Sequence, residues 1–304
     1  MKMRDKLLQL RQKNIFIGTS SWKYLGWKNL VFHRNYRSEK AFKDTCLEEY
    51  SELFTTVGVD HTYYAWPTLA QMQHYAEQTP ESFRFGLKVT ERITVFKYPN
   101  IKRYGKDAGQ RNAHFLDADL FRESFLPPLQ PIKNKLGPLV FEFSQFFPGT
   151  LHSGSEFVSR LDQFFSQLRD LNDYQFAIEI RNANWLKPTY FDLLQKYQIA
   201  PVFNSWTRMP ELSQQFELAS THQFPALVAR LLLQPGTRYE EAVEAFSPYD
   251  RIQEEHPSLR KAGAQLIQKA ISSGKPAYLF VNNRAEGCAP KTIEGIVNLV
   301  ESFF

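Results

Sequence analysis

The sequence predicts an α/β protein in which eight parallel strands, each followed by a helix, close into a single (β/α)8 barrel. Short β-branched or aromatic runs alternate eight times with longer stretches of helical spacing, the order that parallel strands and crossover helices require. The length of 304 residues fits one closed barrel of this kind. An open doubly wound sheet is the alternative, but the segment from Gly18 to Lys23 is not the Gly-rich phosphate turn typical of that fold.

The elements follow one another in a regular order along the chain. The predicted strands are 15–19, 55–60, 83–89, 138–143, 175–181, 199–204, 225–232 and 276–282. The predicted helices are 38–54, 68–78, 117–125, 155–169, 188–197, 211–218, 257–272 and 290–303. Pro188 and Pro290 suit first helical turns, and Gly274 suits a helix end. We therefore expect residues 1–14 to be an N-terminal extension and 15–304 to be one TIM-barrel domain.

Composition restricts the class of protein. The chain is 43% hydrophobic and 23% charged, as in globular proteins, and no run of about 18 apolar residues predicts a membrane span. The N-terminus lacks a secretory signal, and Cys46 and Cys288 are too few for a disulfide framework, so we expect a cytoplasmic protein. The net charge of +5 mildly favours an anionic partner. Oligomeric state is not predicted.

Charged residues recur on the inward faces of the predicted strands, near their carboxyl ends, where (β/α)8 barrels carry their chemistry. Glu179 and Arg181 alternate with Phe176, Ile178 and Ile180, which should face the helices. The same alternation predicts an inner ring of Asp60, Lys88, Glu142, Glu179, Arg181 and Arg230, with Asn204, Asn282 and Asn283 at its rim. These buried charges must pair. They either neutralise one another structurally or serve a ligand, and we favour the ligand.

Aromatic residues crowd the loops that follow the strands. All five tryptophans lie in such loops, and among these aromatic residues we expect Trp22, Trp185, Trp206 and Tyr63 to contact a ligand. The alternative is that large aromatic side chains cap the core of the barrel. The segment 90–113 is long for a connection. It combines aromatic residues with the basic residues Lys97, Lys102, Arg103, Lys106 and Arg111. Such a segment can be a loop that binds phosphate groups or an ordinary solvated loop.

Neither a metal site nor a cofactor is predicted. The seven histidines are scattered, and no His-x-x-x-His or His-x-Glu spacing occurs. A magnesium ion on Asp60, Glu142 and Glu179 would compete with three cations for the same carboxylates. No serine or cysteine near the predicted strand ends has an evident activating partner.

Six motifs in order carry a family resemblance. They include Ile17-Gly-Thr-Ser-Ser-Trp-Lys-Tyr, Ala177-Ile-Glu-Ile-Arg-Asn-Ala-Asn-Trp and Phe280-Val-Asn-Asn. Together they resemble the YecE-like family, domain of unknown function 72, from about residue 15 to 303. The resemblance implies a TIM barrel without an established activity, and a likeness to barrel endonucleases has been proposed for the family.

Individual positions both match and depart from the family pattern. The positions that match are Glu179, Arg181, Asn182, Trp185, Lys88, Arg230 and Asn283. The departures are Gly58 for a usual Glu, Asp60 for Asn, His61 for Ser, Glu142 for Gln, and Leu232 for the His of a usual Arg-x-His-Gly pattern. These changes indicate a distinct subgroup.

The sequence leaves two main functions open, and a non-catalytic ligand sensor or scaffold is a third alternative. We favour a pocket for a small anionic or polyhydroxylated ligand such as a sugar phosphate or a nucleotide fragment. In that pocket Glu179, Glu142 or Asp60 would move protons. The ligand would be bound by basic and amide side chains, namely Lys88, Arg181, Arg230, Asn182, Asn204, Asn282 and Asn283. Whether the protein is an enzyme stays open; if it is one, we expect a metal-independent hydrolase, lyase or isomerase. The alternative is a nucleic-acid binding or processing protein.

Overall fold

Eight parallel strands pair in sequence order and close into a barrel, which confirms the predicted TIM-barrel fold. The computed structural model describes residues 2–147, 149–233 and 236–300. The strands are β1 (Ile15–Thr19), β2 (Thr56–Val59), β3 (Arg84–Lys88), β4 (Leu136–Phe143), β5 (Phe176–Ile180), β6 (Ala200–Asn204), β7 (Leu227–Leu231) and β8 (Ala277–Val281). The barrel closes because β8 pairs with both β7 and β1.

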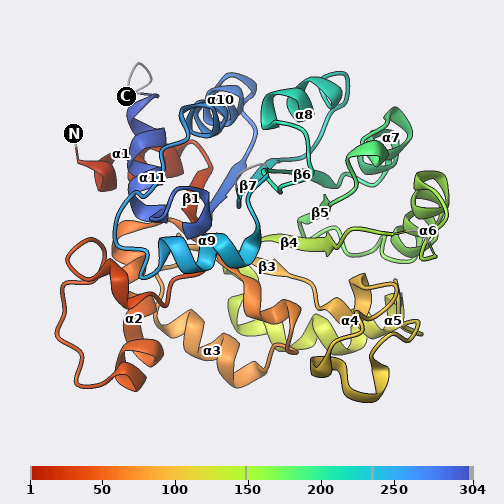
Figure 1. Ribbon diagram of the computed structural model, residues 1–304, viewed down its shortest axis with the longest axis horizontal. Helices are drawn as coiled ribbons and strands as arrows, with labels where there is room; N and C mark the ends of the chain where they lie inside the picture. Colours follow the sequence, from red (N-terminus) through yellow and green to blue (C-terminus); the bar gives the residue numbers. More distant parts are fainter. Residues whose placement is uncertain (1, 148, 234–235, 301–304) are drawn as a thin grey trace.

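Helices surround the barrel (Figure 1). Those that follow the strands are α2 (Glu39–Leu53), α3 (Leu69–Glu77), α6 (Gly154–Ser166), α7 (Pro188–Lys196), α8 (Leu212–Leu218), α10 (Pro257–Ser273) and α11 (Ala289–Asn298). The side chains of Ser38, Thr68 and Ser153 each accept a hydrogen bond from a first-turn backbone amide and so start α2, α3 and α6. Gly274 ends α10 in the left-handed conformation.

The connection between β3 and β4 differs from the single helix predicted over 117–125. It contains α4 (Glu91–Thr94), the 3₁₀ turn η3 (Lys102–Asp107), α5 (Ala118–Leu120), the π-helical turn η4 (Phe121–Phe125) and the 3₁₀ stretch η5 (Pro127–Lys135). Pro127, Pro128 and Pro131 lack the amide hydrogens that would continue an α-helix. Pro138 lies within β4, opposite a register shift against β3, so its missing amide falls where the pairing is irregular.

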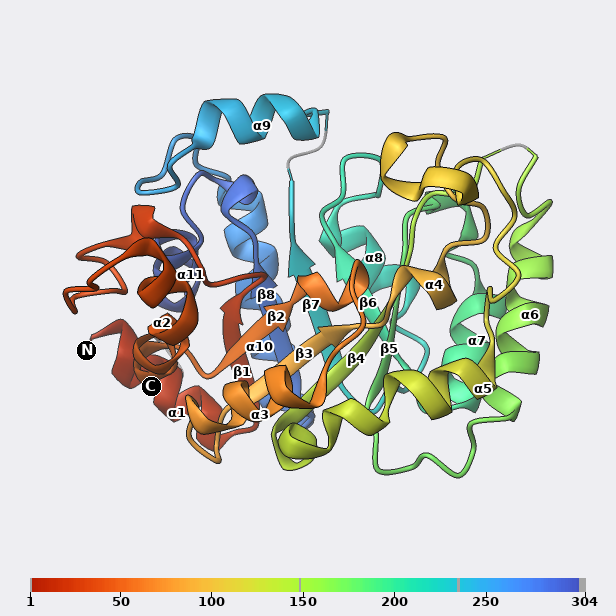
Figure 2. The same ribbon diagram turned by 90° about the horizontal axis from the view of Figure 1, so that it is seen from below.

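Outside the connection between β3 and β4, two of the described helices were not predicted. Residues 1–14, expected as an extension, contain α1 (Met3–Gln12), whose Leu7 and Leu10 are buried and which lies beside α11 (Figure 1). The second, α9 (Tyr239–Phe246), follows β7 and lies at the same end of the barrel as the segment after α4 (Figure 2). No helix among the described residues is long and apolar enough to cross a membrane.

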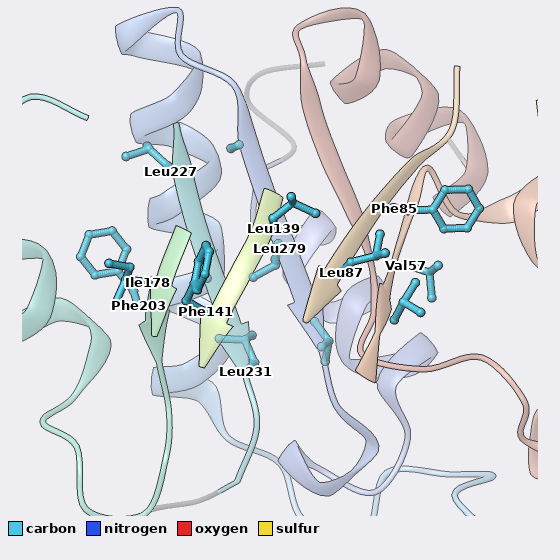
Figure 3. Packing of buried hydrophobic residues seen from close by; sticks show 14 of the residues in the cluster. Val57, Phe85, Leu87, Leu139, Phe141, Ile178, Phe203, Leu227, Leu231 and Leu279 are labelled. Atoms are coloured by element: carbon cyan, nitrogen blue, oxygen red, sulfur yellow. The ribbon is translucent and has the colours of Figure 1, made fainter. Parts of the chain in front are cut away.

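Alternating side chains of the strands fill two separate cores. Outward residues such as Phe141, Ile178 and Leu279 pack against the surrounding helices (Figure 3). The inward residues form a small cluster of Phe16, Val140, Ala177, Ala200, Val202, Ala226, Val228, Tyr278 and Phe280. Gly86 makes room for this inner core, because a Cβ atom there would lie 2.3 Å from the ring of Phe280. Above the inner cluster, toward the carboxyl ends of the strands, the inward positions become charged.

Candidate functional site

Six charged residues meet inside the barrel at the carboxyl ends of its strands. Glu142 and Glu179 occupy paired positions on the adjacent strands β4 and β5, and Arg230 lies opposite them on β7. Asp60 begins the 3₁₀ turn η2 (Asp60–Tyr63) directly after β2, and Lys88 ends β3. The sixth residue, Arg181, directly follows β5. The period of two along the strands turns Lys88, Glu142, Glu179 and Arg230 inward, as the sequence predicts. Asp60 and Arg181, predicted to lie within strands, instead follow directly on the ends of β2 and β5.

Arg230 contacts all three acidic residues. Its Nη1 atom lies 2.7 Å from Glu142 Oε2 and 2.5 Å from Glu179 Oε2, and its Nη2 atom lies 3.1 Å from Asp60 Oδ1. Burial alone would lower the pKa of Arg230, but the attraction of Glu179, Asp60 and Glu142 outweighs it and raises that pKa. The guanidinium group is therefore the centre of the network.

Lys88 and Arg181 complete the pairing around Glu142. Lys88 Nζ lies 2.8 Å from Glu142 Oε2 and 3.3 Å from Asp60 Oδ1. Arg181 Nη2 lies 2.7 Å from Glu179 Oε1 and 3.3 Å from Glu142 Oε2. Burial raises the pKa of Glu142, yet Lys88, Arg181 and Arg230 together hold it well below its usual range. Glu142 is therefore ionised at neutral pH and is poorly suited to donating a proton.

The three carboxylates lie at different depths. Asp60 is 29% exposed and faces the open side, whereas the Glu179 side chain has no solvent exposure. Glu179 is also not among the residues that line the cavity above it. The sequence predicts that Glu179 moves protons in the site. In the structure Glu179 lies below the other charged residues, which form the floor of this cavity, and its two oxygens face Arg230 and Arg181.

A cavity of about 1260 Å³ opens above this floor. Its described lining contains two carboxylates, Asp60 and Glu142, and six cationic side chains. These are Lys88, Lys97, Arg103, Arg181, Arg230 and Arg284. The charged network is balanced in itself, but the wall of the cavity is positive because Glu179 lies outside it and three further cations join from the loops. A cavity lined in this way attracts anions.

Several residues that the sequence assigned to a ligand line this cavity. Besides the three cations of the network, they are Asn282, Trp206 and Tyr63. The guanidinium carbon of Arg181 lies 4.3 Å from the ring centroid of Trp206, and Lys88 Nζ lies 5.4 Å from that of Tyr63. Burial, and next the charge of Glu142, raise the pKa of Tyr63, so its hydroxyl stays protonated. These two rings orient the cations of the floor.

Three asparagines expected at the ligand site do not line the cavity, because their side chains bind backbone groups instead. Asn182 accepts a hydrogen bond from the Phe146 amide (2.9 Å) and donates one to its carbonyl oxygen (3.1 Å). Asn204 donates to the Ile180 carbonyl oxygen (3.2 Å), and Asn283 accepts from the Ala289 amide (2.8 Å). Each asparagine shapes a turn at a strand end.

Two tryptophans assigned to the ligand also lie elsewhere. Trp22 is buried in the outer core, with its ring edge-on to Tyr75 at 5.3 Å. Trp185 stacks on Phe146 and Phe157, with ring centroids 5.0 and 5.3 Å apart. These two tryptophans therefore cap the core, which is the alternative given above. Burying their large rings between loops and helices stabilises the fold by removing apolar surface from water.

Most of the aromatic residues that line the cavity were not assigned to the ligand from the sequence. The segment 95–112 folds over one side of the cavity, where a bridge pairs Lys97 with Arg111. It contributes Phe96, Tyr98, Ile101, Arg103 and Tyr104, and neighbouring loops add Tyr24, Tyr64, Phe146, Phe147 and Arg284. Lys102, Lys106 and Arg111 are not part of the lining. The mixture of basic and aromatic residues in 90–113 indicated that this segment could bind a ligand. It did not show which of these residues line the cavity and which face the solvent.

All five positions at which the sequence departs from the pattern of the family that it resembles lie in or beside the site, and Asp60 and Glu142 among them belong to the charged network described above. A Cβ atom on Gly58 would lie 3.1 Å from Ser20 Cα, so the backbone here leaves little room for the usual glutamate. His61 lines the cavity, and burial lowers its pKa. Leu232 lines the cavity and also packs with Ala242 and Phe246 of α9.

No metal-binding cluster of three or more His, Cys, Asp or Glu residues occurs within the described part of the chain. The carboxylate oxygens of the floor instead face Lys88, Arg181 and Arg230.

Comparison with known proteins gives matches along nearly the whole chain. Residues 16–303 match the family described as "Protein of unknown function DUF72", which is the family that the sequence motifs resemble. The UPF0759 protein YunF of Bacillus subtilis (strain 168) is 26% identical over 178 residues, or 59% of this chain. The match spans 54% of YunF, about half of its length.

Solved structures share the fold. A DUF72 family protein from Enterococcus faecalis V583 superposes with a TM-score of 0.63 at 18% identity, covering 94% of this chain and 95% of the other. A DUF72 family protein from Thermotoga maritima MSB8 superposes with a TM-score of 0.57 at 16% identity, covering 95% and 98%. At these identities the likeness extends to the fold alone.

Proposed function

This chain belongs to the family of proteins of unknown function DUF72, and on that premise we propose that it binds a small anionic or polyhydroxylated ligand in the cavity of its barrel. The observation that carries the proposal is the charge of the lining, six cations against two carboxylates. The cavity lies at the carboxyl ends of the strands, where ligands of (β/α)8 barrels bind.

Arg181 is the best placed anchor for the anionic group. Its side chain is almost fully buried and lines the cavity, and its Nη1 atom has no hydrogen-bond acceptor among the residues that the structure describes. A buried guanidinium nitrogen without an acceptor is costly, so a phosphate or carboxylate oxygen next to Arg181 gains a charge-assisted bond. Lys88 and Arg230 add positive charge beside it.

Asp60 is the group that suits proton transfer. It is the most exposed of the three carboxylates, it lines the cavity, and Lys88 and Arg230 hold it in place. Glu142 is held ionised by three cations, and Glu179 lies below the floor. We propose Asp60 as the residue that accepts a proton from a ligand hydroxyl in a metal-independent hydrolysis, elimination or isomerisation.

Calorimetric titration with inorganic phosphate and ribose 5-phosphate tests the binding proposal. Lys88→Gln removes one cation while leaving Glu142 with Arg181 and Arg230, so the floor stays paired. We expect it to weaken binding of both probes about tenfold, as the loss of one charge-assisted contact predicts. The matched control Lys133→Gln alters a lysine on η5, which pairs with Asp173 and does not line the cavity. No binding by the wild type, or equal weakening by both substitutions, overturns the proposal.

The same titration tests whether Asp60 is dispensable for binding, as its proposed role in proton transfer requires. Asp60→Asn keeps the shape of the side chain and removes its basicity, so we expect binding of ribose 5-phosphate to persist or strengthen as negative charge leaves the cavity. Loss of binding in this variant contradicts the role given to Asp60.

A further inference from the structure

The mouth of the cavity carries exposed apolar side chains. Tyr64, Ile101 and Phe147 are each more than half exposed, and all three line the same cavity. They come from three separate segments of the chain: the loop after η2, the 95–112 segment and the loop after β4. Exposed apolar groups scattered singly need no explanation, but several gathered at one opening mark a surface that binds something apolar.

The aromatic wall is held in a fixed position. Glu91 is buried, and its Oε2 atom accepts hydrogen bonds from Arg103 Nη2 and the Tyr104 hydroxyl, both at 2.8 Å. The guanidinium carbon of Arg103 lies 4.5 Å from the ring centroid of Tyr64 and 4.6 Å from that of Tyr104. Because Arg103 joins the wall segment to the loop after η2, the rings are positioned before any ligand arrives, which lowers the entropic cost of binding.

The cavity is larger than its charged floor requires. Ligand pockets commonly enclose about 300–1,000 Å³, and this cavity encloses about 1260 Å³. A phosphate group on Arg181 would leave most of that space beside the wall. The apolar lining above the floor is mainly aromatic: Tyr64, Phe96, Tyr98, Tyr104, Phe146 and Phe147. Flat rings stack on such side chains better than alkyl chains do.

We propose that the ligand is a phosphate monoester carrying a flat aromatic ring, with the phosphate at Arg181 and the ring against Tyr64 and Phe147. This inference rests on the proposed function, because it places the anion on the same cationic floor. It adds the chemical class of the remainder of the ligand.

Two matched pairs of probes test the role of the ring. Phenyl phosphate is compared with methyl phosphate, and adenosine 5′-monophosphate with ribose 5-phosphate. The members of each pair differ by an aromatic ring, which lies close to the phosphate in the first pair and farther from it in the second. We expect at least one ring-bearing compound to bind about tenfold more tightly than its ringless partner. Tyr64→Ala and Phe147→Ala should each reduce that advantage several-fold while leaving the affinity for methyl phosphate unchanged.

Leu218→Ala is the control, because Leu218 is similarly exposed on α8 but does not line the cavity. It should leave the advantage of the ring intact. Equal affinity within both pairs, or tighter binding of hexyl phosphate than of phenyl phosphate, overturns the inference while the anion site stands. Failure of all the phosphates to bind overturns the proposed function itself.

Discussion

Replacing Glu179 by glutamine should destabilise this barrel strongly. Glu179 is fully buried, and its two oxygens lie 2.5 Å from Arg230 Nη1 and 2.7 Å from Arg181 Nη2. After Glu179→Gln, Arg230 keeps Glu142 and Asp60, but the nearest remaining carboxylate of Arg181 is Glu142, at 3.3 Å. The substitution thus leaves one buried cation short of its partner.

The size of the effect follows from this geometry. Breaking a buried ion pair by removing one partner costs about 3–5 kcal/mol. Glutamine keeps one oxygen that can accept a hydrogen bond, so we expect a loss near the lower limit, about 3 kcal/mol. For a chain of 304 residues, in which unfolding releases about 2.1 cal/mol/K of entropy per residue, that loss lowers the melting temperature by roughly 5 °C. The sequence favours a role in ligand binding for the inward charges, whereas the complete burial of Glu179 favours a structural role for this residue.

Urea unfolding followed by circular dichroism measures the loss directly. Asp60→Asn is the comparison, because Asp60 belongs to the same network but is partly exposed and should cost about 1 kcal/mol or less. A loss below about 1 kcal/mol for Glu179→Gln, or an equally large loss for both variants, would refute the view that the depth of each carboxylate sets its role.

Three further predictions concern charge, aromatic contacts and nucleic acid. The three cationic neighbours of Glu142 lower its pKa in the folded state from the ordinary value of 4.5. Glu142 therefore contributes stability that is fully present above about pH 4.5. This stability is lost as the pH falls toward the pKa of Glu142 in the folded protein. The stability gap between wild type and Glu142→Gln, measured by urea unfolding, should therefore narrow between pH 6 and 3, and a gap that widens would contradict this assignment. Trp206→Leu should weaken phosphate binding in calorimetric titrations because Trp206 covers Arg181, whereas Trp22→Phe should lower stability and leave binding unchanged; the reverse pattern would show that the cavity is wrongly placed. Single-stranded oligonucleotides should show no steeply salt-dependent binding at about 50 mM salt, because the six cationic residues of the candidate site line one cavity rather than an extended face. A steep slope that Lys102→Ala, Arg103→Ala and Lys106→Ala together reduce would instead support the nucleic-acid alternative.

The architecture and the inward charges could be predicted from the sequence because they depend on local periodicity. Eight strand and helix patterns in order leave few folds other than the closed barrel. A period of two along a strand fixes the face on which a side chain lies, so Lys88, Glu142 and Arg230 could be assigned to one interior. The irregular connection after β3 escaped this reasoning, because its short turns have no sustained period.

Only the tertiary structure decided which inward or loop residues reach the cavity. Periodicity gives the face of a strand but not the height of a side chain above its neighbours, so Glu179 and Asp60 looked equivalent in sequence although one lies beneath the floor and the other opens onto the cavity. In loops even the direction of a side chain depends on distant partners. Asn182 turns to the backbone of Phe146 and Trp22 packs on Tyr75, whereas Tyr64 meets Arg103 from a segment far along the chain. Contacts between residues remote in sequence therefore build the site, and no local pattern encodes them.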